Sequence, residues 1–393
     1  MQSLYYTFRR HVVERADRAG HWCNARTIEA YRFRDPRIQR LGRKLPQLAG
    51  SLIHVLKLLP RLDALRLEGR GWNVSFVGDL HMVNELEALL FPDGASRHTR
   101  PRIPAWGVRS FVRGEIGHAD LVVCALPHAW PRVWRATGDV AFTCPIFANA
   151  LIDITPPVGE LLRGSSREPI RRQLKIASRA GLSPRLTRER SDLEHFYWNM
   201  YRPHIQKRHG ARALISSLED HWTQWIAPGG HLLLLEREGR PLAGLLGRLI
   251  GSTYFGGEEG VVQTPEGEEY AYGLRAMLKV ALIEHAREVG ATNLLRGNSL
   301  ARCADPVLAS KLQLGPRVVP SERCQYPEWT FVAERLDGRL RDHLNSQGLI
   351  TFVGDRPCVV SIGLPTDHSR HMARKIGGLL VVEPGQPDRV EDA

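Results

Sequence analysis

The sequence predicts an α/β protein with a mixed, mainly antiparallel sheet and flanking helices. The chain has 393 residues, of which 43% are hydrophobic and 24% are charged. This composition is globular, and the length suits two domains or one large α/β unit. The strongest local signal is the element order β-β-β-α-β-α across residues 231–314, which is an antiparallel meander, a buried crossover helix and a further strand.

Hydrophobic spacing and turn residues predict the elements before this region. Leucines at helical spacing predict that residues 1–70 are mainly helical. The further elements are a strand at 72–77, a helix at 80–91, an exposed Arg/Pro/Gly-rich loop at 93–118, and strands at 120–126 and 151–154.

Residues 163–190 hold nine Lys or Arg residues and two acids. A helix here places basic side chains on one face and apolar ones on another, with Gly181 as its C-cap. The basic residues of that face are Arg167, Arg171, Arg172, Lys175 and Arg179. The face either binds an anionic partner, which relieves the repulsion, or is simply solvated.

A capping box at Ser191 and Glu194 predicts the start of another helix. Its apolar stripe is read as core, and Pro203 is expected to kink or end the helix. His209, beyond this proline, either contacts an acceptor or lies in a solvated loop.

Between residues 231 and 314 the expected strands are 231–236, 242–250 and 252–255. A glycine-rich loop at 256–268 follows, then a long helix at 269–289 with Gly290 at its C-cap. A strand at 291–295 and a helix ending near Leu312 complete the pattern. Two further strands are expected at 327–332 and 357–362.

Four segments are predicted along the chain. They are an N-terminal α/β domain (1–150), a second domain (151–335), a strand-containing extension (336–383) and a disordered tail (384–393). The longest apolar stretches are too short to span a membrane, and the N-terminus lacks the apolar core of a secretory signal. The expected location is therefore cytoplasmic. The six scattered cysteines form no CxxC pair, so free thiols and no metal site are expected.

The net charge is +12, and seven of the 54 basic residues are lysines. Arginine suits bidentate recognition of phosphate and carboxylate groups. The excess of arginine indicates either a polyanionic ligand, such as a nucleotide, coenzyme, RNA or anionic lipid, or a bias in codon usage.

Several segments, taken in order, resemble the FemAB-like branch of the GNAT acyltransferase superfamily, which includes cellulose-biosynthesis-type acetyltransferases. They read SSREPIRRQLKIASRAGL (165–182), DLEHFYWNMYRPHIQKRHG (192–210), LEREGRPLAG (235–244) and LLRGNSLARCADPVLASKLQLG (294–315). The resemblance covers residues 150–320. It implies a GNAT-type fold, and residues 1–150 would hold a degenerate first half.

Two departures from the family pattern bear on the donor. Acyl-CoA-dependent members carry Q/R-x-x-G-x-G/A where the buried helix begins, and this chain instead has Gln263 to Gly273 with three glutamates among its first residues. The FemAB branch lacks that loop because its donors include aminoacyl-tRNA. At the family's acidic, Tyr-Lys and Trp-Gly positions this chain keeps Asp305 and Lys311 but has Ser310 and Leu314.

The candidate catalytic residues are Glu258, Glu259 and Lys311. Either glutamate is a candidate base or an ordinary loop acid, and Lys311 either binds phosphate or the oxyanion or is a surface lysine. Asp305 either orients Lys311 or caps the helix that begins there. The remaining candidates for substrate binding are Arg171, Arg172, Lys175, Arg296, Asn298, Tyr254 and His209.

The resemblance implies transfer of an acyl group to an amine or hydroxyl of a small or envelope-precursor acceptor. Acyl-CoA is the expected donor and co-substrate. The alternative is an aminoacyl-tRNA-dependent, amide-forming transferase, for which tRNA would be a partner. An alternative of another class is a non-catalytic protein that binds RNA or membrane surfaces through the basic stripe. The sequence does not define the oligomeric state.

Overall fold

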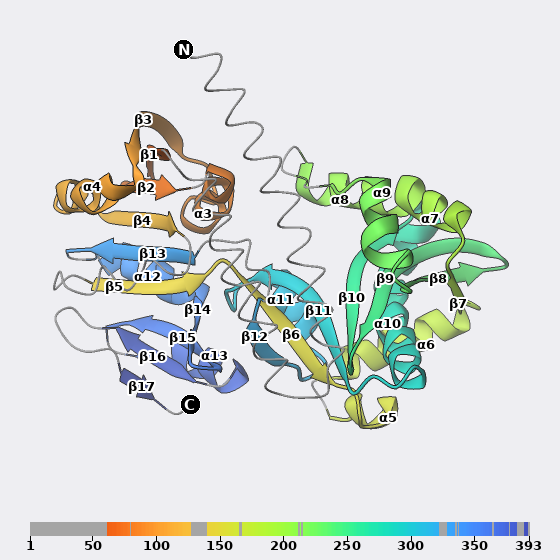
Figure 1. The fold of residues 1–393 in the computed structure, drawn as a ribbon. Coiled ribbons are helices and arrows are strands. Elements are labelled where there is room, and N and C mark those ends of the chain that lie inside the picture. The colour runs from red at the N-terminus through yellow and green to blue at the C-terminus, as the bar shows by residue number, and fades with distance from the viewer. Residues whose placement is uncertain are drawn as a thin grey trace, which may run out of the picture. The chain divides into compact units, whose positions relative to one another are not determined.

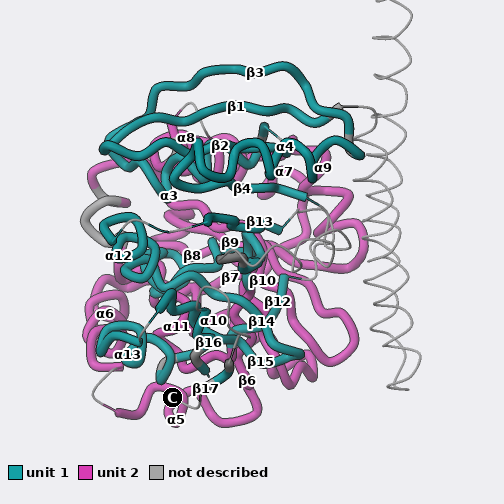
Figure 2. The backbone as a smooth tube through the Cα atoms, turned by 90° about the vertical axis from the view of Figure 1, so that its left-hand side faces the viewer, with its two compact units in different colours: residues 1–148, 298–309, 318–393 teal, residues 149–297, 310–317 magenta. Residues whose placement is uncertain are grey.

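The computed structural model describes 61–78, 80–126, 140–164, 167–210, 213, 215–321, 328–334, 336, 338–363, 365–376, 378–382 and 389–391. The chain divides into two compact units, coloured separately in Figure 2. Unit 1 comprises residues 1–148, 298–309 and 318–393, and unit 2 comprises 149–297 and 310–317. These units interleave along the chain, whereas the domains predicted from the sequence are continuous, and those boundaries stay predictions.

Unit 2 is built on a sheet with the strand order β6-β11-β10-β9-β8-β7. The strands are β6 (Phe147–Asp153), β7 (Ser183–Thr187), β8 (His231–Arg237), β9 (Arg240–Ile250), β10 (Thr253–Val261) and β11 (Asn293–Leu300). From β7 to β10 neighbouring strands are antiparallel, whereas β10 and β11 are parallel. A parallel pair needs a crossover connection, and a long helix provides it.

Helices cover both faces of this sheet (Figure 1). One face carries the crossover helix α10 (Pro265–Glu288), which packs against α6 (Glu168–Arg179) and α5 (Val158–Leu161). The other face carries α7 (Arg190–Phe196), the π-helix η5 (Tyr197–Tyr201), α8 (Arg202–His209), α9 (Leu218–His221) and the π-helix η7 (Trp222–Ile226). The two faces are called below the α10 face and the α9 face.

Glycines in β9 and β10 let the covering layers approach the sheet closely. A Cβ at Gly257 would lie 2.6 Å from the ring of Trp225, and one at Gly260 would lie 2.5 Å from the backbone of Tyr201. The glycine-rich stretch after residue 255 is therefore strand rather than the expected loop. Glycine has a low strand propensity, but it is favoured here because neighbouring groups approach the strand closely.

Unit 1 holds two sheets. The first has the order β3-β1-β2-β4-β13-β5, and the second has β14-β15-β16-β17. The first comprises β1 (Arg61–Gly69), β2 (Trp72–Gly78), β3 (Ser96–Pro104), β4 (Leu121–Leu126), β5 (Val140–Pro145) and β13 (Glu328–Ala333). The second comprises β14 (Ile350–Val353), β15 (Arg356–Ile362), β16 (Leu379–Val382) and β17 (Arg389–Glu391).

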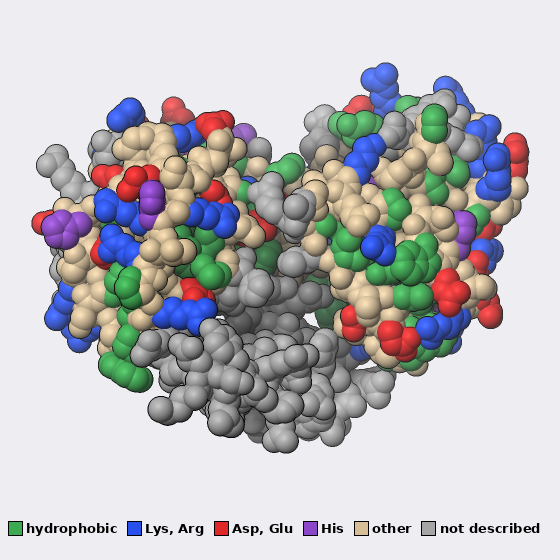
Figure 3. Space-filling view, turned by 90° about the horizontal axis from the view of Figure 1, so that it is seen from above, with side chains coloured by type: hydrophobic (Ala, Val, Ile, Leu, Met, Phe, Trp, Pro, Cys, Tyr) green, Lys and Arg blue, Asp and Glu red, His purple; other side chains and the backbone are tan. Residues whose placement is uncertain are grey.

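The helices of unit 1 are short. They are η1 (Leu80–Met82), α3 (Val83–Leu90), η2 (Ala105–Gly107), α4 (Val108–Glu115), α12 (Gly338–Gln347) and α13 (Asp367–Ile376). Apolar residues of α3, α4 and α12 join the cores on its sheets. Basic and acidic side chains lie beside one another on the face of unit 1 seen in Figure 3, in keeping with pairs such as Arg102–Asp63. Helix α11 (Pro306–Leu312) and strand β12 (Arg317–Pro320) cross the boundary between the units.

The predicted α/β class is confirmed, with mixed, mainly antiparallel sheets and flanking helices. The order β-β-β-α-β-α is present as β8, β9, β10, α10, β11 and α11. Gly181 and Gly290 follow their helices at φ of +69° and +85°, as a C-terminal cap requires. The basic stripe does lie on a helix, and Ile170 and Ala177 form its buried side.

The structure differs from three other expectations, two near the start of the chain and one at its end. The segment 93–118 contains β3 and α4 instead of a loop, because β3 pairs with β1 along an exposed edge. Of the expected helix at 1–70, residues 1–60 lie outside the described part, and residues 61–69 form a strand because alternate leucines pack into the core. Arg389–Glu391 pairs with β16 within the segment expected to be disordered.

The expected helix start at Ser191 was also wrong, and of the two expectations for Pro203, a kink or an end, the end was wrong. Helix α7 begins one residue earlier, and its N-cap position is Glu189 with no side-chain cap. The π turn at 197–201 directly precedes Pro203, so the helix continues through the position where proline lacks an amide donor.

Candidate functional site

A β-bulge in β10 decides which face of the sheet each of two neighbouring carboxylates occupies. The β9 register runs from Gly256 opposite Gly247 to Glu259 opposite Leu245, so Gly257 and Glu258 together oppose one residue. An extra residue in a strand reverses the alternation of side chains beyond it. Glu258 therefore contacts His221 on the α9 face, while Glu259 contacts Arg275 on the α10 face.

Glu258 is held by a buried histidine on the α9 face. The Nε2 atom of His221 forms an ion pair with Oε2 of Glu258, and Ser216 Oγ donates to Oε1 of Glu258 at 3.5 Å. His221 is 1% exposed, and its ring meets those of Tyr201 and Tyr197 edge-on at centroid distances of 4.7 and 5.4 Å. The side chain of Glu258 is 34% exposed, so solvent reaches this carboxylate but not the histidine.

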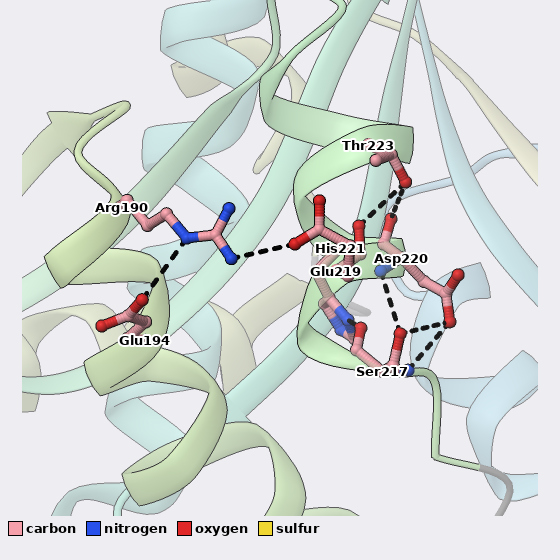
Figure 4. Close-up of polar contacts among 7 residues, drawn as sticks. All are labelled: Arg190, Glu194, Ser217, Glu219, Asp220, His221 and Thr223. Atoms are coloured by element: carbon pink, nitrogen blue, oxygen red, sulfur yellow. Dashed lines mark hydrogen bonds and ion pairs between the residues drawn. The ribbon is translucent and has the colours of Figure 1, made fainter.

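The local sequence fixes the position of His221 (Figure 4). Ser217 caps α9 in a complete capping box with Asp220, and His221 follows at the end of this short helix. The ring Nδ1 lies 2.7 Å from the carbonyl oxygen of Ser217. A carbonyl only accepts, so Nδ1 carries a proton and Nε2 faces the carboxylate.

His221 and Glu258 differ in their surroundings. Burial disfavours the charged form of His221, but the hydrogen bonds that its ring donates to Glu258 and Ser217, with the charge of Glu258, outweigh it, so the pKa of His221 is raised above its ordinary value. Both ring nitrogens are engaged within the protein, so neither is directed at a substrate. Glu258 is the member of the pair that solvent reaches, and the buried His221 holds it.

Three cations surround Glu259 on the α10 face. Arg275 Nε lies 3.3 Å from Oε1 of Glu259, and Arg296 Nη2 lies 3.8 Å from Oε2. Lys279 donates from Nζ to Ser310 Oγ at 3.1 Å. Arg296 is 9% exposed and Lys279 is 8% exposed. Burial and then the charge of Arg296 lower the pKa of Lys279 to about 8, and burial lowers that of Arg296.

The other predicted residues near β11 have structural contacts. Lys311 Nζ donates to the carbonyl oxygen of Gly297 at 2.8 Å, which ties α11 to β11. Asp305 accepts a hydrogen bond of 2.7 Å from the amide of Leu308, so it caps α11, which was one of the two alternatives for this residue. Asn298 accepts from Ser321 at 2.8 Å. Tyr254 is 1% exposed and belongs to the core under α10, which makes it a packing residue.

The basic residues of α6 differ in whether they have contacts within the protein. Arg171 forms an ion pair with Glu168 and donates to the carbonyl oxygens of Leu162 and Gly164, so its guanidinium is used at the start of its own helix. Arg172 and Lys175 are exposed. His209 is the last residue of α8. The assignment of any of these residues to a binding site stays a prediction.

The start of α10 does not fit the pyrophosphate of an acyl-CoA. Pro265, the first helical residue, has no amide hydrogen, and the amide of Gly267 donates to the Thr264 cap at 3.2 Å. A Cβ on Gly267 would lie 2.2 Å from the carbonyl oxygen of Val262, so backbone closes this turn. Two of the amides that a helix start normally offers are therefore missing or taken, whereas a phosphate cradle uses several.

Among the described residues, no group of three or more His, Cys, Asp or Glu side chains is placed to bind a metal ion. None of the described helices combines the length and apolar character needed to cross a membrane.

Sequence reasoning named Glu258 and Glu259 but missed His221 and Lys279. The capping box at Ser217 was the available signal for α9, yet the partner of His221 lies on another strand. Lys279 is one of several charged residues of α10, and its hydrogen bond to Ser310 joins it to a segment 31 positions away. Tertiary contacts create both environments.

Comparisons with known proteins give fold-level likenesses alone. No family model and no curated protein matches the chain. The similar solved structures include L-PGS from Bacillus licheniformis, at 13% identity over 74% of this chain and 89% of that one, with a TM-score of 0.34. FemX matches at 13% identity over 70% and 89%, with a TM-score of 0.36.

A GCN5-related N-acetyltransferase-like protein from Streptococcus suis matches at 13% identity over 70% of this chain and 84% of that one, with a TM-score of 0.25. At these scores the likenesses carry no argument about activity. Any function therefore has to be argued from the chain's own residues.

Proposed function

We propose that the chain is an acyltransferase in which Glu258 is the general base. The observation that supports this proposal is the placement of Glu258 on a strand bulge, one-third exposed and held by the buried His221. Acyl transfer to an amine or hydroxyl requires that the acceptor lose a proton, and a positioned carboxylate accepts it directly or through one water.

The bulge supports a second requirement of the reaction. The attacking nitrogen or oxygen bonds to the acyl carbonyl carbon, and negative charge develops on the carbonyl oxygen before the leaving group departs with the shared electron pair. Backbone amides stabilise such an oxyanion. The β9 register pairs neither Gly257 nor Glu258, so their amides are candidate donors beside the base.

The donor is proposed from the α10 start and the α6 surface. The closed first turn of α10 disfavours acyl-CoA held by its pyrophosphate at that helix. The exposed Arg172 and Lys175 favour the aminoacyl-tRNA alternative, because a phosphate backbone would neutralise them. The same two residues would serve the non-catalytic alternative, an RNA- or membrane-binding protein.

Two assays on the purified chain separate these possibilities. Transfer of radiolabelled amino acids from aminoacyl-tRNA to amine acceptors, abolished by nuclease, is the expected result. Acetyl-CoA is tested in parallel by transfer and by thermal shift, because a ligand that binds the native state alone raises the melting temperature. A clear shift and transfer with acetyl-CoA, insensitive to nuclease, would establish the acyl-CoA donor. Transfer from neither donor would overturn the acyltransferase proposal, and transfer by Glu258→Gln at the wild-type rate would overturn the role of Glu258 as base.

A further inference from the structure

The cationic cluster of Arg275, Lys279 and Arg296 on the α10 face has more positive charge than its protein partners balance. Glu259 is the carboxylate that pairs with these side chains in the described part of unit 2. Three cations thus share one acid, and two of the three are more than nine-tenths buried. Buried charges in proteins are normally paired and hydrogen-bonded, because desolvation is costly.

Donors within the cluster are also underused. The Nη1 atom of Arg296 is buried and has no hydrogen-bond partner. An ammonium group has three donors, and Lys279 directs one of them at Ser310 Oγ. Ser310 is neutral and leaves the positive charge of Lys279 unbalanced. An oxygen-rich anion would supply both the acceptors and the charge.

The cluster lies where two strands part. The parallel pairing of β10 and β11 runs from Thr253 opposite Asn293 to Gly256 opposite Arg296, after which β10 bulges. The side chains of Glu259 and Arg275 are 22% and 37% exposed, so solvent reaches the cluster from their side. Arg296 and Lys279 form its buried part.

We propose that this cluster is a binding site for an oxyanion, a carboxylate or phosphate group carried by the substrate. Arg296 Nη1 and Lys279 donate to its oxygens, and Arg275 closes the exposed side. Guanidinium groups suit both anions because their parallel donors match two oxygens at once. The proposal deepens the acyltransferase function by giving the substrate an anionic group, but it concerns binding and needs no turnover to be tested.

Protonation of Lys279 gives the site a pH dependence. Arg275 on α10 and Arg296 on β11 favour the neutral amine, Glu259 on β10 favours the ammonium, and burial brings the pKa of Lys279 to about 8. A bound anion favours the ammonium, so binding draws a proton onto Lys279. Affinity therefore falls as pH rises through about 8.

The test measures melting temperature at pH 7 against inorganic phosphate and against acetate, with chloride holding ionic strength constant. We expect one of the two anions to raise the melting temperature saturably, and this result identifies the source as phosphate or carboxylate. Arg296→Met should weaken the fitted affinity roughly 10- to 100-fold, because a charged hydrogen bond is lost. Arg240→Met is the matched control, since it removes one exposed charge far along β9 and should respond as the wild type does.

Two further results decide the proposal even if Arg296→Met folds poorly. Glu259→Gln removes the competing acid and should tighten anion binding several-fold. Without added anion, Lys279→Met should melt at or above the wild-type temperature, because it replaces an unbalanced buried charge by an apolar side chain. The proposal is overturned if neither anion gives a saturable shift, or if Glu259→Gln responds to both anions as the wild type does.

Discussion

The α9 and α10 faces of β10 place two adjacent glutamates in opposite electrostatic settings. Glu258 meets one buried histidine, whose pKa is raised, and aromatic rings surround that histidine. Glu259 meets three cations, two of them buried with lowered pKa values. Adjacent side chains of a strand face opposite sides of the sheet, and the bulge decides which side each of these two glutamates occupies.

The comparison teaches that residue type alone does not assign a role. On the α9 face an exposed carboxylate with a supporting histidine suits proton transfer. On the α10 face the carboxylate is outnumbered by cations, so the surroundings suit charge recognition. The predictions below test this division.

The largest expected effect is on the rate of transfer. Glu258→Gln keeps the shape of the side chain but removes the proton acceptor, so kcat should fall by about 10²- to 10⁴-fold. Glu259→Gln should mainly lower KM and change kcat little, because we propose that the cations beside Glu259 bind the substrate and take no part in the proton transfer. Initial rates with the donor that supports wild-type turnover measure both. Equal losses of kcat in the two variants would contradict the division between the faces.

The next effect is on stability. His221→Ala opens a cavity beside Tyr197 and Tyr201 and leaves Glu258 without its partner, and it should lower the free energy of unfolding by about 2–4 kcal/mol. Urea denaturation at pH 6 measures the change. His195→Ala, on the exposed side of α7, is the control and should stay within about 0.5 kcal/mol of the wild type. A similar small change for His221→Ala would show that its contacts contribute little.

Sequence reasoning anticipated the order of elements around β10 but not the division of its two faces. Alternating apolar residues and the glycine at the end of α10 are local signals, and they predicted the meander and the crossover helix. The bulge depends on the register with β9, and the pairing of His221 with Glu258 joins segments 37 positions apart. No short stretch of sequence predicts the bulge or the pairing of His221 with Glu258. The glycines led to a wrong prediction of a loop. Gly257 and Gly260 lie in a strand, where they allow Trp225 and Tyr201 to pack closely.

The two faces should respond to pH with opposite signs. The pKa of His221 is raised above 6.5, so its contribution to stability is complete below pH 6.5 and is lost as pH rises through the folded-state pKa. The pKa of Lys279 falls from 10.5 to about 8, so the unfolded chain binds more protons between these values and stability rises with pH there. Urea titrations of His221→Gln and Lys279→Met should each lose one of the two slopes. Retention of both slopes in both variants would show that other groups cause them.

The smallest effect concerns the α6 surface. Arg172→Glu with Lys175→Glu should weaken binding of total tRNA several-fold at low salt, and the difference should shrink at high salt. Both residues are exposed, so circular dichroism should not change. Arg171 is left intact because it is bound within its own helix. Unchanged tRNA binding would remove the stripe from the donor site.

The most direct test of the division between the faces is a nuclear magnetic resonance titration of His221 in protein with labelled histidine. The wild type and Glu259→Gln should both show His221 titrating above 6.5, because the carboxylate of Glu258 is present in each. Glu258→Gln should lower the pKa of His221, since burial is then opposed only by the weaker effects of the Ser217 carbonyl and Asp220. A pKa for His221 that is unchanged in Glu258→Gln, or that falls in Glu259→Gln instead, would contradict the account.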